Sequence, residues 1–195
     1  MSDAAWTVQK GVEYAQHDGV SLRGDLYQPS GEGVFPAIIA VHGGGWQSGG
    51  PGSYRHWGAY FAARGYVFFP IAYRLSRPGV KTYPEAVHDL RAAVQFLRGR
   101  GGDIKVDSQH VGLMGGSAGG QLVSLVALAG DEPPFVGAYP DDAYSHLSTR
   151  AQAVAPFYGV FDMARQWSHD VQCRPYDNIT EKFMGAAATE ERRRY

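Results

Sequence analysis

A serine at the centre of a glycine-rich turn is the residue in this sequence best suited to nucleophilic chemistry. Residues 115–119 read Gly-Gly-Ser-Ala-Gly, so glycines lie two positions to either side of Ser117. This pattern is typical of a sharp turn from a strand into a helix, where larger flanking side chains would collide. The free N–H groups and the dipole of the following helix would favour a negatively charged oxygen beside the serine. We therefore expect the Ser117 hydroxyl to be exposed at the tip of a sheet.

The same five-residue pattern is also found in turns whose serine has no catalytic role. Other glycine motifs fit this turn less well. A dinucleotide-binding fingerprint would need glycine where Ser117 stands, and a phosphate-binding loop would need a lysine that the turn lacks. A catalytic interpretation therefore depends on a second feature upstream.

That second feature is a run of three glycines directly after an apolar segment. Residues 42–46 read His-Gly-Gly-Gly-Trp and follow the run Pro36–Val41. Consecutive residues without Cβ let the backbone approach a ligand and turn its N–H groups toward it. The alternative is a flexible turn, but three glycines in this position destabilise a fold unless the backbone has to be exposed.

Short apolar runs alternate with helical patterns around these two segments. The runs that predict strands are residues 12–14, 21–27, 36–41, 66–71, 111–114 and 153–158. The patterns that predict helices are residues 54–64, 84–97 and 118–129. The alternation predicts an α/β fold with a mostly parallel sheet, helices on both faces and an N-terminal antiparallel hairpin. Both glycine-rich segments would lie at the carboxyl ends of strands, where such sheets carry their reactive residues.

Length and charge restrict the classes of function. With 195 residues, of which 44% are hydrophobic, the chain predicts one domain over residues 1–195. A net charge of −1 predicts neither nucleic acid nor an anionic membrane as a partner. No apolar run reaches the roughly 18 residues that a membrane span needs. The single cysteine, Cys173, and an N-terminus without signal-peptide features predict a cytoplasmic protein.

The two glycine-rich motifs together resemble the α/β-hydrolase family, in particular its hormone-sensitive-lipase-like and feruloyl-esterase-like carboxylesterases. The resemblance covers roughly residues 12–162. The segments that carry it are His42–Trp46, Ala72–Leu75, Asp89–Leu97, Asp107 and Gly115–Gly120.

The resemblance implies a role for each of these segments. Ser117 would attack a small-molecule ester and form an acyl-enzyme, with no metal or cofactor. The backbone N–H groups of Gly44, Gly45 and Ala118 would form the oxyanion hole. Trp46 and Tyr158 would be candidates for the walls of the substrate pocket. His42 would brace the glycine loop and would not act as a base.

The sequence departs from the family after the sixth strand. Family members continue with a strand followed by an acidic residue and, later, a histidine. Residues 161–195 are instead polar and helix-prone, as in a cap or excursion, so we expect the C-terminal strands, the catalytic acid and the catalytic histidine to be missing. An incomplete sheet edge would favour a homo-oligomer or pairing with another chain.

Residues present in the chain could substitute for the missing acid and base. The candidates that follow Ser117 are His146, His169, Asp162, Asp170 and Asp177, although we expect Asp162 to cap a helix. The remaining histidines are expected to be ordinary surface residues: His17, His56, His88 and His110. Two functions stay open, a serine carboxylesterase and a catalytically inactive hydrolase-like module that serves in binding or interaction.

Overall fold

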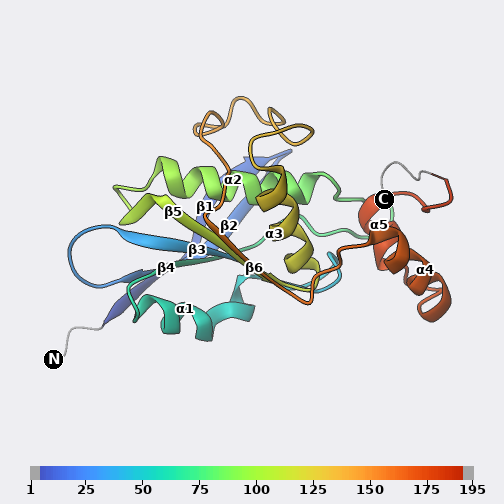
Figure 1. Ribbon diagram of the computed structural model, residues 1–195, viewed down its shortest axis with the longest axis horizontal. Coiled ribbons are helices and arrows are strands. Elements are labelled where there is room, and N and C mark those ends of the chain that lie inside the picture. The colour runs from blue at the N-terminus through green and yellow to red at the C-terminus, as the bar shows by residue number, and fades with distance from the viewer. Residues whose placement is uncertain (1–4, 191–195) are drawn as a thin grey trace.

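A six-stranded mixed sheet runs through the centre of the computed structural model, which describes residues 5–190 (Figure 1). Its strands lie in the order β1-β2-β4-β3-β5-β6. Their bounds are β1 Trp6–His17, β2 Val20–Pro29, β3 Phe35–Val41, β4 Val67–Ile71, β5 Val106–Gly116 and β6 Ala153–Phe157. The helices are η1 Pro51–Tyr54, α1 Arg55–Ala62, α2 Glu85–Gly99, α3 Ala118–Ala129, α4 Met163–Cys173 and α5 Ile179–Met184. The predicted α/β fold is confirmed.

The predicted N-terminal hairpin is also confirmed. Strands β1 and β2 pair antiparallel, and positive φ angles at Asp18 (50°) and Gly19 (77°) suit the tight turn between them. Strand β2 is antiparallel to β4, whereas β4, β3, β5 and β6 run parallel to one another. The carboxyl ends of β3 and β5 therefore lie side by side, and His42 and Ser117 follow them.

Helices cover both faces of the sheet, as predicted. Helix α1 lies on one face, and α2 and α3 lie on the other (Figure 1). All five residues of β4 are buried, and the core divides into a large cluster beneath α2 and α3 and a smaller one that includes Phe68, Met114 and Ala62. Fully burying one such large apolar side chain stabilises the fold by about 1.5–3 kcal/mol.

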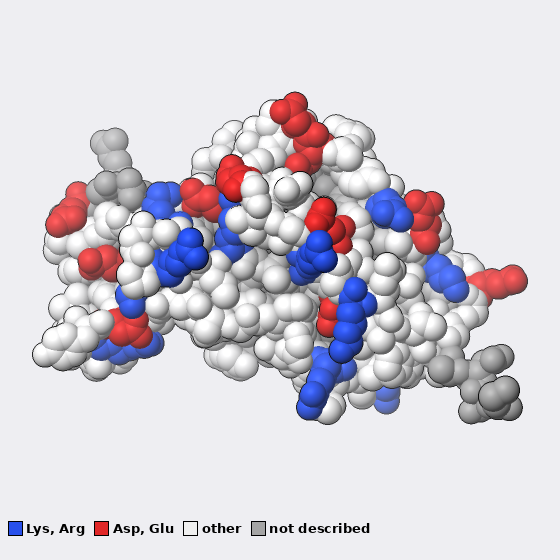
Figure 2. Space-filling view, turned by 180° about the vertical axis from the view of Figure 1, so that it is seen from behind, with Lys and Arg blue, Asp and Glu red and all other residues white. Residues whose placement is uncertain are grey.

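Strand β6 forms one edge of the described sheet. It pairs only with β5 among residues 5–190, and most of its residues are exposed. The exposed fractions are 42% for Val154 and 49% for Phe157. On the face of the molecule seen in Figure 2, acidic and basic side chains are interspersed, as the small net charge leads us to expect.

The segment after β6 is helical, as its composition predicts. Asp162 caps α4 by accepting a hydrogen bond from the Arg165 amide, at 2.9 Å, so its predicted capping role is confirmed. No helix in the described range is both long and apolar enough to cross a membrane. Residues 191–195, which are expected to belong to the same segment, lie outside the described residues.

Helices α4 and α5 are joined by one buried carboxylate. Asp170 is fully buried and accepts hydrogen bonds from the Thr180 hydroxyl at 2.6 Å and the Thr180 amide at 3.2 Å. The Gln166 side chain donates to its other oxygen at 2.9 Å. Because charged hydrogen bonds in a buried site are among the stronger ones, this residue should hold the two helices together.

Replacing Asp170 should therefore destabilise the C-terminal segment. We expect Asp170→Ala to lower the free energy of unfolding by about 3 kcal/mol, because the buried donors of Thr180 and the partly buried amide of Gln166 would lose their acceptor. Asp162→Ala is the matched control on the same helix and should cost about 1 kcal/mol, the usual effect of a lost cap. Urea unfolding followed by circular dichroism measures both. Equal losses in the two variants would contradict the role given to Asp170.

Candidate active site

The turn between β5 and α3 holds Ser117 in a strained backbone conformation. Its φ is 55° and its ψ is −121°, a combination that non-glycine residues rarely adopt. Two backbone hydrogen bonds hold it there: the Ser117 amide donates to the Phe157 carbonyl at 2.9 Å, and the Gln121 amide donates to the Ser117 carbonyl at 3.0 Å. The side chain is partly exposed, as the pattern of the turn predicts.

Two glycines allow this turn to touch the end of β3. A Cβ on Gly119 would lie 2.0 Å from the carbonyl oxygen of Val41. A Cβ on Gly43 would lie 2.9 Å from the Gly116 carbonyl oxygen and 3.2 Å from the Ser117 Cβ. Only backbone without side chains can approach this closely, so the two glycine-rich segments are in direct contact.

The glycine loop turns sharply after Gly43. Gly44 has a φ of 119°, and its carbonyl accepts hydrogen bonds from the amides of Gln47 and Ser48, both at 3.1 Å. Within residues 5–190, the amides of Gly44, Gly45 and Ala118 have no hydrogen-bond acceptor. Ala118 is the first residue of α3, so its amide has no acceptor inside the helix. The three amides of the expected oxyanion hole are therefore free to donate.

The side chain of Trp46, at the end of the glycine-rich segment, is packed in the core. It is fully buried, its ring stacks on Phe183 with 4.6 Å between centroids, and its indole N–H donates to the Gln121 side chain at 3.2 Å. The expectation that Trp46 walls an open substrate pocket is therefore not met in the described residues. The sequence did not indicate that Phe183, on α5, would stack on Trp46.

The imidazole of His42 is buried beside the same loop. It stacks on Tyr73 with 4.5 Å between centroids, and its Nδ1 lies 2.7 Å from the Gly43 carbonyl oxygen. Burial lowers the pKa of His42, and the Gly43 carbonyl only partly opposes this. The ring is therefore neutral near pH 7, with Nδ1 donating to Gly43.

Two tyrosines border the turn on its open side. Tyr158 is 82% exposed and has a φ of 42°. A Cβ on Gly116 would lie 2.9 Å from the Tyr158 Oη, so the phenol lies against the backbone next to Ser117. The Tyr54 hydroxyl donates to the Val41 carbonyl at 3.2 Å, and burial together with the nearby Tyr158 raises the Tyr54 pKa.

No histidine of the described residues forms a hydrogen bond to Ser117. The two histidines that follow it in the sequence, His146 and His169, are both exposed. Asp162 and Asp170 are engaged in holding α4 and α5, and Asp177 forms ion pairs with Arg174 and Lys182. Among the described residues, none of these candidate substitutes forms a hydrogen bond with the Ser117 side chain.

His17 is buried, so the expectation that it is an ordinary surface residue is wrong. Its side chain is 1% exposed and contacts two carboxylates. The sequence offered no local signal, because its partners lie 72 and 125 residues away along the chain.

Comparison with known proteins identifies the family of this chain. The BD-FAE family profile matches residues 24–195. The chain belongs to the BD-FAE family. Curated relatives include the Mycobacterium tuberculosis proteins named "Probable carboxylic ester hydrolase LipM", 31% identical over 68% of this chain, and "Esterase LipQ", 30% identical over 66%. The chain spans only 30% of the length of LipM and 29% of that of LipQ.

Solved structures of one esterase share the fold of this BD-FAE chain. Thermogutta terrifontis esterase 2 phosphorylated by paraoxon is 31% identical, with a TM-score of 0.69, over 83% of this chain and 60% of that one. Its propionate-bound structure is 29% identical, with a TM-score of 0.71, over 94% of this chain and 64% of that one.

The contact at Gly119 leads to a direct test. We expect Gly119→Ala to lower the free energy of unfolding by about 3 kcal/mol, because the new methyl group would overlap the Val41 carbonyl. Gly52→Ala is the control, since a Cβ there meets nothing within 4 Å. Chemical denaturation of both variants measures the difference. A Gly119→Ala protein as stable as Gly52→Ala would show that the two segments are not packed as described.

Proposed function

We propose that this chain carries the nucleophile and the oxyanion hole of a serine carboxylic ester hydrolase. In the proposed reaction the Ser117 oxygen bonds to the carbonyl carbon of an ester, the bond to the alcohol oxygen breaks, and the alcohol leaves with a proton. Water then attacks the acyl-enzyme, releases the acid and returns the proton to Ser117.

One observation carries this proposal: the backbone contact between the glycine loop and the turn that holds Ser117. It supports a site in which the free amides of Gly44, Gly45 and Ala118 donate to the oxygen that becomes negative during attack. Removing one such donor typically costs about 100- to 1,000-fold in rate. Because Ala118 begins α3, the helix dipole would add to the stabilisation.

The substrate we propose is an ester of a short acyl acid. The supporting comparison is the Thermogutta terrifontis esterase, which has been solved with propionate and with butyrate bound. Tyr158 would contact the substrate, since its exposed phenol borders the turn next to Ser117. The proposed chemistry needs no metal or cofactor.

A second candidate function is a binding or interaction module with a hydrolase fold. The observation that favours it is the absence of a histidine hydrogen-bonded to Ser117 within residues 5–190. A serine without a base keeps only weak residual reactivity. The two functions therefore differ in whether Ser117 is activated.

Covalent labelling separates the two functions. We expect the protein to gain the mass of one phosphonyl group after exposure to a fluorophosphonate, and of one phosphoryl group after exposure to paraoxon. Ser117→Ala should abolish both adducts. Ser53→Ala, which removes an exposed serine of η1, should leave them unchanged. Intact-mass spectrometry measures the adducts.

The absence of labelling in a folded, monodisperse sample would contradict an activated Ser117 and favour the binding module. Labelling that persists in Ser117→Ala would assign the nucleophile to another residue. Hydrolysis of p-nitrophenyl butyrate by the labelled and unlabelled protein then tests turnover and the proposed short acyl group.

A further inference from the structure

His17 lies between two carboxylates that come from different parts of the chain. Its Nδ1 is 3.0 Å from Asp89 Oδ1 on α2, and its Nε2 is 2.8 Å from Asp142 Oδ2 in the segment that connects α3 to β6. Ionised carboxylates accept hydrogen bonds and do not donate them. Both contacts are hydrogen bonds only when both ring nitrogens carry a proton. Arg74 Nη2 is also 3.5 Å from His17 Nδ1, but it donates to the charged Asp89 Oδ1 at 2.6 Å. The geometry therefore favours the charged imidazolium form of His17.

The groups around the ring favour that charge. Tyr139 stacks on His17 with 3.6 Å between centroids and an interplanar angle of 3°. Arg74 binds Asp89 and also reaches Asp18, so a charged His17 gives two cations among three carboxylates. With a neutral His17, Arg74 would be the single cation among the same three carboxylates. Other titratable groups nearby are Tyr14, whose pKa is affected by Asp89 and Arg74, and His88, whose ring lies 6.0 Å from that of Tyr139. Glu85 and Arg91 on α2 act in turn on His88.

The segment held by this cluster is a loop, residues 131–149, that lies over α2 (Figure 1). Its end, residues 145–149, is held by side chains that do not titrate near neutral pH. The Gln95 amide donates to the carbonyls of Ser145 and Leu147, and Arg98 donates to that of Ser148. Its beginning is held by Phe135, which is buried and packs on Tyr83 and His88. Between these two ends, residues 136–142 meet the His17 cluster.

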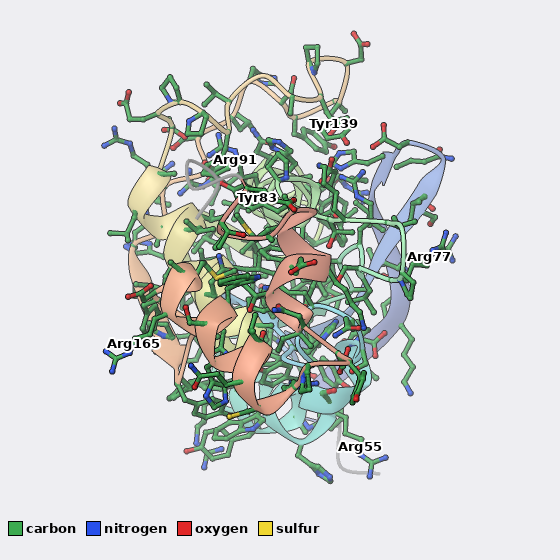
Figure 3. All side chains as sticks on the ribbon, turned by 90° about the vertical axis from the view of Figure 1, so that its right-hand side faces the viewer. Arg55, Arg77, Tyr83, Arg91, Tyr139 and Arg165 are labelled. Atoms are coloured by element: carbon green, nitrogen blue, oxygen red, sulfur yellow. The ribbon has the colours of Figure 1, made fainter. Side chains whose placement is uncertain are left out.

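Three contacts attach residues 136–142 to the rest of the molecule at this cluster. Asp142 binds His17, the Tyr139 ring stacks on His17, and the Tyr139 hydroxyl donates to Asp18 at 2.7 Å. In Figure 3, Tyr139 lies in the loop on the side of the β1–β2 hairpin, and Arg91 lies beneath the loop. A cavity of about 320 Å³ separates this loop from α2, and its lining includes His17, Arg91 and Tyr139.

We propose that His17 is a proton-operated latch: its charged form holds residues 136–142 of loop 131–149 against this cavity, and loss of the proton releases them. A neutral imidazole has one N–H group. That proton should stay on Nδ1, facing the fully buried Asp89, which leaves the Nε2 lone pair against the carboxylate of Asp142. Repulsion between these two acceptors then opens the partly exposed side of the cluster.

The direction of the pH dependence follows from the His17 pKa. Burial disfavours the charged ring, but the hydrogen bonds and charges of Asp89 and Asp142 outweigh it, so the pKa of His17 is raised. A raised pKa in the closed state means that the latch is fully effective below the ordinary histidine value. Its effect is lost as the pH rises through the raised pKa of the closed state.

Hydrogen–deuterium exchange of the full chain between pH 5.5 and 9 tests the latch. After correction for intrinsic exchange, peptides from residues 136–144 should lose protection by up to roughly tenfold per pH unit between the ordinary and the raised pKa of His17. Peptides from β3 and β5 should show no such change. Nuclear magnetic resonance titration of the His17 ring should give a pKa above the ordinary histidine value.

Asp142→Asn tests the loop side of the latch without altering the buried Asp89. It should lower loop protection at pH 5.5 to the level that the unmodified protein shows at high pH, remove the pH dependence and lower the His17 pKa. His146→Gln is the control, because this exposed histidine lines the same cavity and does not contact the cluster. Its pH profile should match that of the unmodified protein. Loop protection that does not vary with pH, or an unchanged profile in Asp142→Asn, would overturn the proposal.

Discussion

The close approach of two backbones at the end of β3 is the constraint on which the rest of the candidate site depends. Gly119 lies against the Val41 carbonyl, and Gly43 lies against Gly116 and Ser117. A side chain at either position would overlap the facing backbone and force the two segments apart. Because no side chain is present, the serine, the free amides of the loop and the N-terminus of α3 share one edge of the sheet.

A buried side chain, Asp89, holds together a second group of residues near the carboxyl ends of the strands. Asp89 is fully buried and binds Arg74, which follows β4, and His17, which ends β1. Removing a charge from water is costly unless its hydrogen bonds are satisfied, and here the Arg74 amide and guanidinium and the His17 ring supply them. The same cluster holds loop 131–149, so one buried group links the hairpin, α2 and that loop.

Local physical rules made much of the fold predictable. The apolar runs became β3 and β4 because parallel strands are buried on both faces, and the Gly-x-Ser-x-Gly turn followed from the crowding at a strand-to-helix corner. Trp46 and His17 could not be predicted in the same way. Their surroundings come from Phe183 and Asp142, whose positions depend on how α5 and loop 131–149 pack.

The sequence by itself determined the order of strands and helices, the strained turn at Ser117 and the need for exposed backbone after β3. These features arise from backbone sterics and from hydrophobic periodicity over a few residues. Only the tertiary structure decided that the Trp46 indole is buried, that the candidate acids Asp162, Asp170 and Asp177 are engaged elsewhere, and that His17 lies between two carboxylates. Each of these depends on the electrostatic and packing environment that distant segments create, and such an environment exists only once the chain has folded.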